Sequence, residues 1–379
     1  GYFGARERIW DEPAYRNIFG LLNDFGDAEI ASLIIPRKLI IDPSSAPIIN
    51  VPRGTGGKPG KIPSFTPDEM NSEIKRAGLS IGNINQYLEN PARGHDAKLL
   101  PIEKLGDIQA RAFDEINRHN QELLSKSAGL RNQFLSKMDT SSLDKFEKSM
   151  TSYRKYFGEK VIGIFDDKLV NPHPKTRLLN ETDSFISYEV VLDVFGGSNS
   201  LFAYGILTVP KDITKNGKKR PVVVCQHGLE GRPQSTIGEK EHHYYKAFST
   251  ELAKLGFVTF APQNIYIFQD RFRALQFKAN SIGKTLFSIM VPQHQQITNW
   301  LGSLDFVDKK RIGFYGLSYG GKSAMRIPPL VKNYCLSICS ADFNEWVWKN
   351  ASTRSPHSYV WSGEYEIFEW DLGSTFNYF

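Results

Sequence analysis

The sequence is poor in cysteine. Its 379 residues contain three, Cys225, Cys335 and Cys339, and each lies inside an apolar, strand-like run. A cysteine in such a run most often acts as a small buried hydrophobic residue. We therefore expect all three to be buried, and their odd number gives no indication of the redox compartment.

Long apolar runs are missing as well. No stretch reaches the roughly 18 residues that cross a bilayer, and the longest runs, residues 222–225 and 255–261, have the length of strands. The formal charge is only +6, from 47 Lys and Arg against 41 Asp and Glu, and the basic residues form no block. The sequence therefore predicts neither a membrane span nor a nucleic-acid-binding surface.

Motifs for metals and nucleotides are also lacking. No group of His, Cys, Asp and Glu has the spacing of a metal site. The GTGGK run at 54–58 lacks the residue spacing and the Ser or Thr after lysine that a phosphate-binding loop needs. It falls in a stretch rich in proline and glycine, residues 42–67, which predicts a loop or linker. We expect no metal and no cofactor.

The first residues, GYFGARERIW, contain no initiator Met, no basic n-region and no apolar h-region, so no signal peptide is visible. We expect the natural protein to begin further upstream. The compartment is therefore left open, with a secreted or periplasmic location among the alternatives.

Hydrophobic periodicity predicts where helices and strands lie. Helices are expected at 70–77, with Thr66 as the N-cap, and at 105–137 and 141–157, where they pack ahead of the next domain. A hairpin is expected at 188–194 and 202–209. After it, strands at 222–225, 257–261, 311–315 and 335–340 alternate with helices at 240–255, 293–304 and 322–326. This alternation predicts an α/β fold with a mostly parallel sheet, in which ligands bind at the carboxyl ends of the strands.

The pattern Gly316-Leu317-Ser318-Tyr319-Gly320 lies between a predicted strand and a predicted helix. This is the context of the Gly-x-Ser-x-Gly nucleophile elbow, where the serine occupies a strained turn and glycines let strand and helix pack closely. We expect Ser318 to be the catalytic nucleophile. The alternative is an ordinary turn whose serine only caps the helix.

The second candidate stretch is QHGLEG, residues 226–231, directly after the first buried strand. Acyl transfer needs two backbone N–H donors for the oxyanion, one after the nucleophile and one from such an earlier loop. Tyr319 is the first donor by position, and Leu229 is favoured over Gly228 for the second. The alternative is a glycine-containing turn that His227 braces.

These motifs resemble the α/β-hydrolases of the dienelactone hydrolase and acetyl xylan esterase type, with VVVCQHGLEGRP as the oxyanion loop and RIGFYGLSYGGK as the elbow. The resemblance covers 188–379 and implies helices on both faces of the sheet and serine-dependent ester hydrolysis. FGDAEIASLIIPRKLII, at 25–41, resembles the segment that precedes the acid-bearing loop in such hydrolases. The resemblance therefore implies tandem units: residues 1–100 as the remnant of a first unit with a linker, 101–187 as a helical lead-in, and 188–379 as a hydrolase domain with C-terminal strands absent.

The rest of the catalytic triad is harder to place. The fold uses the order Ser, then Asp or Glu, then His, and Asp342 follows the strand after the elbow. His357 comes too early for the general base and is read as a lid histidine, and His294 is read as structural. Three interpretations remain: a segment of a longer enzyme with its histidine beyond Phe379, an inactive scaffold, or a sheet completed by the strand before Asp42.

Between residues 261 and 293 lies an insertion that contains Arg271, Arg273, Lys278 and several aromatic residues, Tyr266, Phe268, Phe272 and Phe277. Arg271 and Arg273 could bind a sugar-like substrate beside those rings. The alternative is a lid or packing helix with a solvated basic face. We expect a serine esterase that acts on a small-molecule or carbohydrate ester, with acetylated sugars as one candidate substrate. The alternative function is a catalytically inactive module that binds carbohydrate or a partner.

Overall fold

The structure is a computed structural model that describes residues 3–13, 16–37, 39, 41, 49–51, 60–62, 64–79, 107–213, 217–238, 243–268 and 270–341. The chain divides into two compact units. The first comprises residues 1–138, 280–283 and 346–376, and the second comprises 139–279, 284–345 and 377–379.

The helices are α1 (Leu21–Asp24), α2 (Asp27–Ser32), α3 (Pro67–Arg76), α5 (Ile108–Phe134), α6 (Leu143–Tyr156), α7 (Phe248–Lys254), α8 (Asp270–Ser281), α9 (Leu286–Ser303) and α10 (Tyr319–Arg326). The strands are β1 (Ile49–Val51), β2 (Gly60–Ile62), β3 (Lys175–Glu181), β4 (Phe185–Phe195), β5 (Leu201–Pro210), β6 (Arg220–Gln226), β7 (Val258–Pro262), β8 (Val307–Leu317) and β9 (Tyr334–Ser340). Short 3-10 helices and one π-helix, Phe157–Ile162, connect some of them.

In the first unit, the predicted capping box at the start of α3 is confirmed. The Thr66 hydroxyl accepts the Glu69 N–H at 3.2 Å, and the Glu69 carboxylate accepts the Thr66 N–H at 2.7 Å. These two bonds satisfy donors that a helix start leaves without partners. Ala28 and Ala31 of α2 pack beside Ala77 in a small apolar cluster.

The long predicted helix is confirmed as α5, but its packing is not. Phe113, Ile116 and Leu123 repeat at helical spacing and are all exposed. α5 falls in the first compact unit, whereas α6 and β3 fall in the second. The helical lead-in at 101–187 stays a prediction. None of the described helices is long and apolar enough to cross a membrane.

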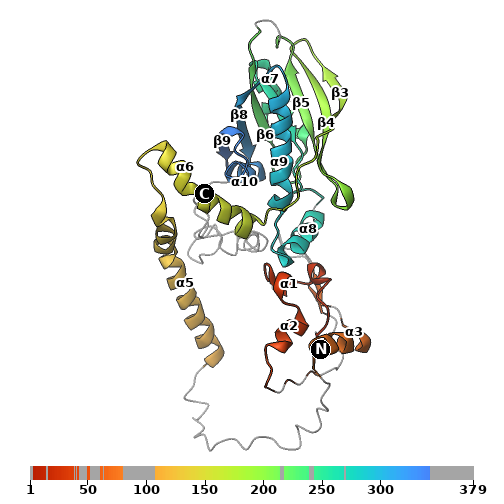
Figure 1. The fold of residues 1–379 in the computed structure, drawn as a ribbon, viewed down its shortest axis with the longest axis vertical. Helices are drawn as coiled ribbons and strands as arrows, with labels where there is room; N and C mark the ends of the chain where they lie inside the picture. Colours follow the sequence, from red (N-terminus) through yellow and green to blue (C-terminus); the bar gives the residue numbers. More distant parts are fainter. Residues whose placement is uncertain are drawn as a thin grey trace, which may run out of the picture. The chain divides into compact units, whose positions relative to one another are not determined.

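The second unit contains a seven-stranded sheet in the order β3-β4-β5-β7-β6-β8-β9. β3, β4 and β5 run antiparallel to one another, β5 is antiparallel to β7, and β7, β6, β8 and β9 are parallel (Figure 1). The crossover places β6 between β7 and β8, so the loop after β6 lies beside the turn after β8. The predicted hairpin and the α/β class with a mostly parallel core are confirmed.

Helices cover both faces of this sheet. Phe314 of β8 contacts His294 of α9 at 5.3 Å between ring centroids, whereas the next residue, Tyr315, contacts Phe248 of α7 at 4.9 Å. Successive side chains of a strand point to opposite faces, so α9 and α7 lie on opposite sides. This arrangement explains why the centre of β6, residues 222–225, is apolar and why all five residues of β7 are buried.

Several boundaries differ from prediction for identifiable reasons. α9 begins at Leu286, seven residues before the start predicted at 293, because Thr285 caps the helix there and Pro292 lies inside it. Of the helix predicted at 240–255, only Phe248–Lys254 is helical among the described residues. β3 was missed because all seven of its residues are exposed and show no alternation.

The cysteine expectation is correct for one residue and wrong for another. Cys225 is buried in β6, and burial raises the pKa of its thiol to about 12. Cys335, in β9, is exposed, and Cys339 is half-buried. The apolar run in β9 therefore does not mark a strand covered on both faces within the described part of the chain.

We expect the free energy of unfolding to fall when a side chain in the part of the sheet core covered by α9 is made smaller. Phe314→Leu should lower the free energy of unfolding by about 1–2 kcal/mol, because Phe314 is fully buried between His294 and Tyr334. Phe202→Leu is the matched control, since Phe202 is exposed on β5. Chemical denaturation of both variants measures the difference, and equal losses would contradict this packing.

Candidate active site

Ser318 occupies the sharp turn between β8 and α10. Its backbone has φ 60° and ψ −120°, outside the regions that a residue with a Cβ normally adopts. The Ser318 N–H donates to the Ser340 carbonyl and the Lys322 N–H donates to the Ser318 carbonyl, both at 2.9 Å. The predicted strained strand–turn–helix is confirmed.

The glycines on either side of Ser318 are required by close contact. A Cβ on Gly316 would lie 1.9 Å from the Gly320 carbonyl oxygen, and a Cβ on Gly320 would lie 2.2 Å from the Gln226 carbonyl oxygen. Backbone atoms cannot yield to such contacts as a flexible side chain can. Gly320 therefore lets the start of α10 approach the end of β6.

The Ser318 side chain is exposed and makes no capping hydrogen bond to α10. The alternative interpretation, a serine that only caps the helix, is therefore wrong. Tyr319 is the first residue of α10, where backbone N–H groups point out of the helix end. The turn thus presents a hydroxyl and a helix N-terminus on the same side.

The loop after β6 touches this turn at Gly228. A Cβ on Gly228 would lie 3.1 Å from the Ser318 Cβ and 3.1 Å from the Tyr245 hydroxyl. The Gly228 N–H donates to that hydroxyl at 2.8 Å, and the Glu230 and Gly231 N–H groups donate to the carbonyls of Tyr266 and Gly228. Within the described residues, the Leu229 N–H has no backbone acceptor.

His227 braces the loop and is neutral. Its Nε2 accepts the Asn264 N–H at 3.3 Å, so its Nδ1 carries the proton and donates to the Gly228 carbonyl at 2.8 Å. Burial, with a smaller contribution from the nearby Arg232 charge, lowers the pKa of His227 to about 4. With both ring nitrogens bonded, His227 does not act as a base toward Ser318.

His294 lies beneath the sheet in a second buried network. Its Nε2 donates to Gln226 Oε1 at 3.2 Å, and its Nδ1 accepts the Tyr334 hydroxyl proton at 2.8 Å. The Gln226 amide donates in turn to the Pro262 carbonyl at 3.2 Å. Burial lowers the pKa of His294 to about 3, so the predicted structural role of this histidine is confirmed.

Two predicted site residues cannot be placed. Asp342 and His357 lie outside the described residues, so the acid and base roles considered for them stay predictions. Among the residues that are described, no group of three or more His, Cys, Asp and Glu could hold a metal ion.

The two arginines of the insertion lie on different faces of α8. Arg271 is exposed, whereas Arg273 is 6% exposed with its guanidinium 5.0 Å from the Phe272 ring centroid. Residues two apart on a helix do not share a face. The spacing in the sequence alone therefore argues against a joint binding role for Arg271 and Arg273. Of the four aromatic residues proposed as binding faces, only Phe268 is exposed.

Two residues with a clear role in shaping the site gave no signal in the sequence. Tyr245 holds the Gly228 N–H from a position 17 residues away. The Asn264 side chain donates to the His227 carbonyl at 3.0 Å across a separation of 37 residues. Neither lies in a recognisable motif, because both act through contacts that only the folded sheet creates.

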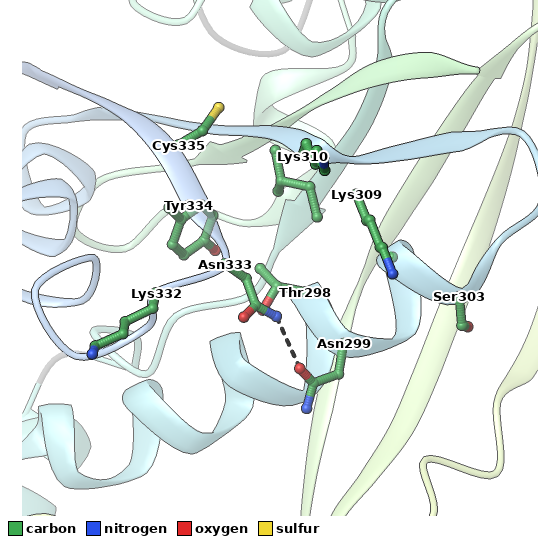
Figure 2. A pocket seen from close by; sticks show the side chains of 11 residues that line it. Thr298, Asn299, Ser303, Lys309, Lys310, Lys332, Asn333, Tyr334 and Cys335 are labelled. Atoms are coloured by element: carbon green, nitrogen blue, oxygen red, sulfur yellow. Dashed lines mark hydrogen bonds between the residues drawn. The ribbon is translucent and has the colours of Figure 1, made fainter. Parts of the chain in front are cut away.

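A cavity of about 570 Å³ lies elsewhere on the second unit (Figure 2). Lys309 and Lys310 of β8 line it together with Lys332, Asn333 and the last turns of α9. At about 3.3 Å per residue along a strand, these lysines are roughly 26–30 Å from Ser318. The cavity is therefore separate from the candidate active site.

Comparison with known proteins gave matches only among solved structures. No protein-family model matches the sequence. No curated protein matches it either.

The matched structures include acetyl xylan esterases and glucuronoyl esterases. A protein of Bacteroides fragilis NCTC 9343, provisionally named an acetyl xylan esterase, is 16% identical with a TM-score of 0.41, over 50% of this chain and 52% of that one. The acetyl xylan esterase from Paenibacillus sp. R4 is 19% identical with a TM-score of 0.37, over 60% and 71%. A glucuronoyl esterase from Solibacter usitatus is 15% identical with a TM-score of 0.37, over 58% and 68%. The chain thus spans about half the length of the first of these proteins.

We expect the strain at Ser318 to be measurable. Ser318→Gly should be more stable than Ser318→Ala by about 1 kcal/mol, because glycine adopts positive φ without steric cost whereas alanine keeps the Cβ. Both variants remove the hydroxyl, so the comparison isolates the backbone. Equal unfolding midpoints in chemical denaturation would show that the turn is unstrained.

The two buried histidines should make stability depend on pH. In the unfolded chain their pKa returns to about 6.5, above the folded values of about 4 for His227 and 3 for His294. Their contribution is therefore complete above pH 6.5 and is lost as pH falls, by about 2 kcal/mol each between pH 6.5 and 5. His294→Gln should roughly halve this loss in denaturation curves taken from pH 7 to 5, and an unchanged slope would refute the assignment.

Proposed function

We propose that the second unit is a carboxylic ester hydrolase with Ser318 as its nucleophile. The observation that carries this proposal is the placement of Ser318, exposed at a strained turn that two close glycine contacts support. A capping or packing serine has no need for this conformation. A nucleophile needs it, because the turn presents the hydroxyl to a substrate while the helix N-terminus stabilises negative charge nearby.

The oxyanion donors in this proposal are the N–H groups of Tyr319 and Leu229. Tyr319 begins α10, and Leu229 follows Gly228, which lies against the Ser318 Cβ. Gly228 provides room for the close approach, since its own N–H is bonded to Tyr245. One such donor typically contributes a factor of about 10²–10³ to kcat.

The reaction would proceed through an acyl-enzyme. Ser318 Oγ attacks the ester carbonyl and transfers its proton to a general base, which then protonates the departing alcohol. Water attacks the acyl group in the second step and releases the acid. His227 and His294 are excluded as the base because each is buried with both ring nitrogens bonded. We assign the base to a histidine outside the described residues. Asp342, which follows β9, is proposed as the acid that orients it.

The substrate class we propose is an ester of a carbohydrate, with acetylated sugars as the first candidates. The exposed Phe268 ring and the exposed Arg271 guanidinium support a sugar-like ligand, because aromatic faces and arginine forks suit such ligands. Arg273 is left out of the binding role, since its side chain is buried.

A fluorophosphonate probe should label Ser318 in the protein encoded by the natural gene. Ser318→Ala should abolish labelling, because the probe reacts only with a nucleophilic serine beside an oxyanion site. Ser303→Ala is the control, since Ser303 is an exposed serine near the cavity of Figure 2. Peptide mapping by mass spectrometry identifies the labelled residue. If the folded protein is not labelled, the inactive binding module replaces this proposal.

A further inference from the structure

Phe268 is unusual in both conformation and exposure. Its φ is 66°, and its side chain is 51% exposed. A bulky residue in the left-handed region is an outlier in protein structures, and burial of its ring does not compensate here. Backbone strain that persists without packing gain suggests a functional role.

The Phe268 backbone is fixed to the candidate oxyanion loop. Its N–H donates to Glu230 Oε2 at 3.0 Å, and the Glu230 N–H donates to the Tyr266 carbonyl at 2.8 Å. On the other side, the Arg271 N–H donates to the Phe268 carbonyl at 3.0 Å. These three hydrogen bonds therefore fix the backbone that carries the Phe268 ring.

Two guanidinium groups share this ring. The Arg232 Cζ lies 5.6 Å and the Arg271 Cζ 5.7 Å from its centroid, within cation–π range. Both side chains are exposed, and neither forms an ion pair with a carboxylate among the described residues. Glu230, the nearby acid, accepts the Phe268 N–H. The two arginines and this one glutamate together carry a net charge of about +1, and both arginine side chains are exposed.

This cluster is close to the candidate nucleophile. Arg232 follows four residues after Gly228, which touches Ser318, and the Tyr266 ring lies 4.7 Å from the Tyr319 ring. A ligand bound at Phe268 would therefore extend toward the serine from the side of the oxyanion loop.

We propose that Arg232, Phe268 and Arg271 form a subsite for a sugar that carries an anionic group in addition to the ester to be cleaved. The two guanidinium groups bind the anionic oxygens, a geometry that arginine favours for carboxylate and phosphate. The exposed part of the Phe268 ring contacts the apolar face of the sugar. This inference rests on the proposed function, since it assigns the charge of the substrate at the same site.

Binding can be measured separately from catalysis in Ser318→Ala protein, which leaves a bound ester intact. Isothermal titration calorimetry would compare xylotetraose with a tetrasaccharide of three xyloses and one glucuronic acid, and glucose with glucose 6-phosphate. The acidic member of at least one pair should bind about tenfold or more tightly than its neutral partner. The pair that shows the difference identifies the anion as carboxylate or phosphate, and equal affinities within both pairs would overturn the proposal.

Substitutions locate the effect. In the Ser318→Ala background, Arg232→Ala and Arg271→Ala should each weaken binding of the acidic ligand about tenfold, the size of one charge-assisted hydrogen bond. Lys309→Ala removes an equal charge at the distant cavity and should change nothing. Phe268→Asn keeps a residue that tolerates positive φ and should weaken both acidic and neutral ligands. Equal losses in Lys309→Ala would attribute binding to overall charge and refute the subsite.

The two proposals fail in different ways. If the protein binds the acidic sugar but is not labelled at Ser318, the subsite proposal is supported and the hydrolase proposal is refuted. If the protein is labelled at Ser318 but binds acidic and neutral sugars equally, the hydrolase proposal is supported and the subsite proposal is refuted.

Discussion

The site depends on one close approach of backbone to backbone. The start of α10 meets the end of β6 where Gly320 faces the Gln226 carbonyl, at a distance that leaves no room for a Cβ. Because β6 lies beside β8 in the sheet, this contact brings the loop at Gly228 against Ser318. The strain in the Ser318 backbone is a consequence of the same approach, since the chain must turn sharply to enter α10. The parallel strand order thus fixes the distance between Ser318 and the loop at Gly228.

Buried neutral histidines support this contact from two sides. His227 fastens the loop to the segment after β7, and His294 joins α9 to Gln226 and Tyr334. Their ring nitrogens hold neighbouring segments in place by hydrogen bonds, and burial disfavours their protonation. The amide of Gln226 links the two networks, because Gln226 bonds to His294 and directly precedes His227. Both histidines are therefore part of the structural framework around Ser318.

The sequence predicts what local chemistry decides. The Gly-x-Ser-x-Gly turn, the capping box at Thr66 and the strands around residues 222–225 and 311–315 follow from residues close together in the chain. Tyr245 and Asn264 could not be found in this way, because their partners are distant and share no pattern with them. The charge of Arg271 and Arg273 suggests a shared binding role, but their spacing of two residues on α8 places them on different faces, and Arg273 is buried. The sequence therefore contained the information needed to exclude Arg273.

In the two proposals, the loop that follows β6 combines two tasks that enzymes often divide among separate segments. Leu229, the proposed oxyanion donor, lies three residues before Arg232, and Glu230 between them fastens Phe268. Since His227 and Asn264 hold the base of this loop, the Leu229 amide and the Arg232 backbone belong to one anchored segment. A ligand that draws Arg232 toward its anionic group would therefore also set the position of the Leu229 N–H. Recognition of the substrate and stabilisation of its transition state would then depend on one rigid element.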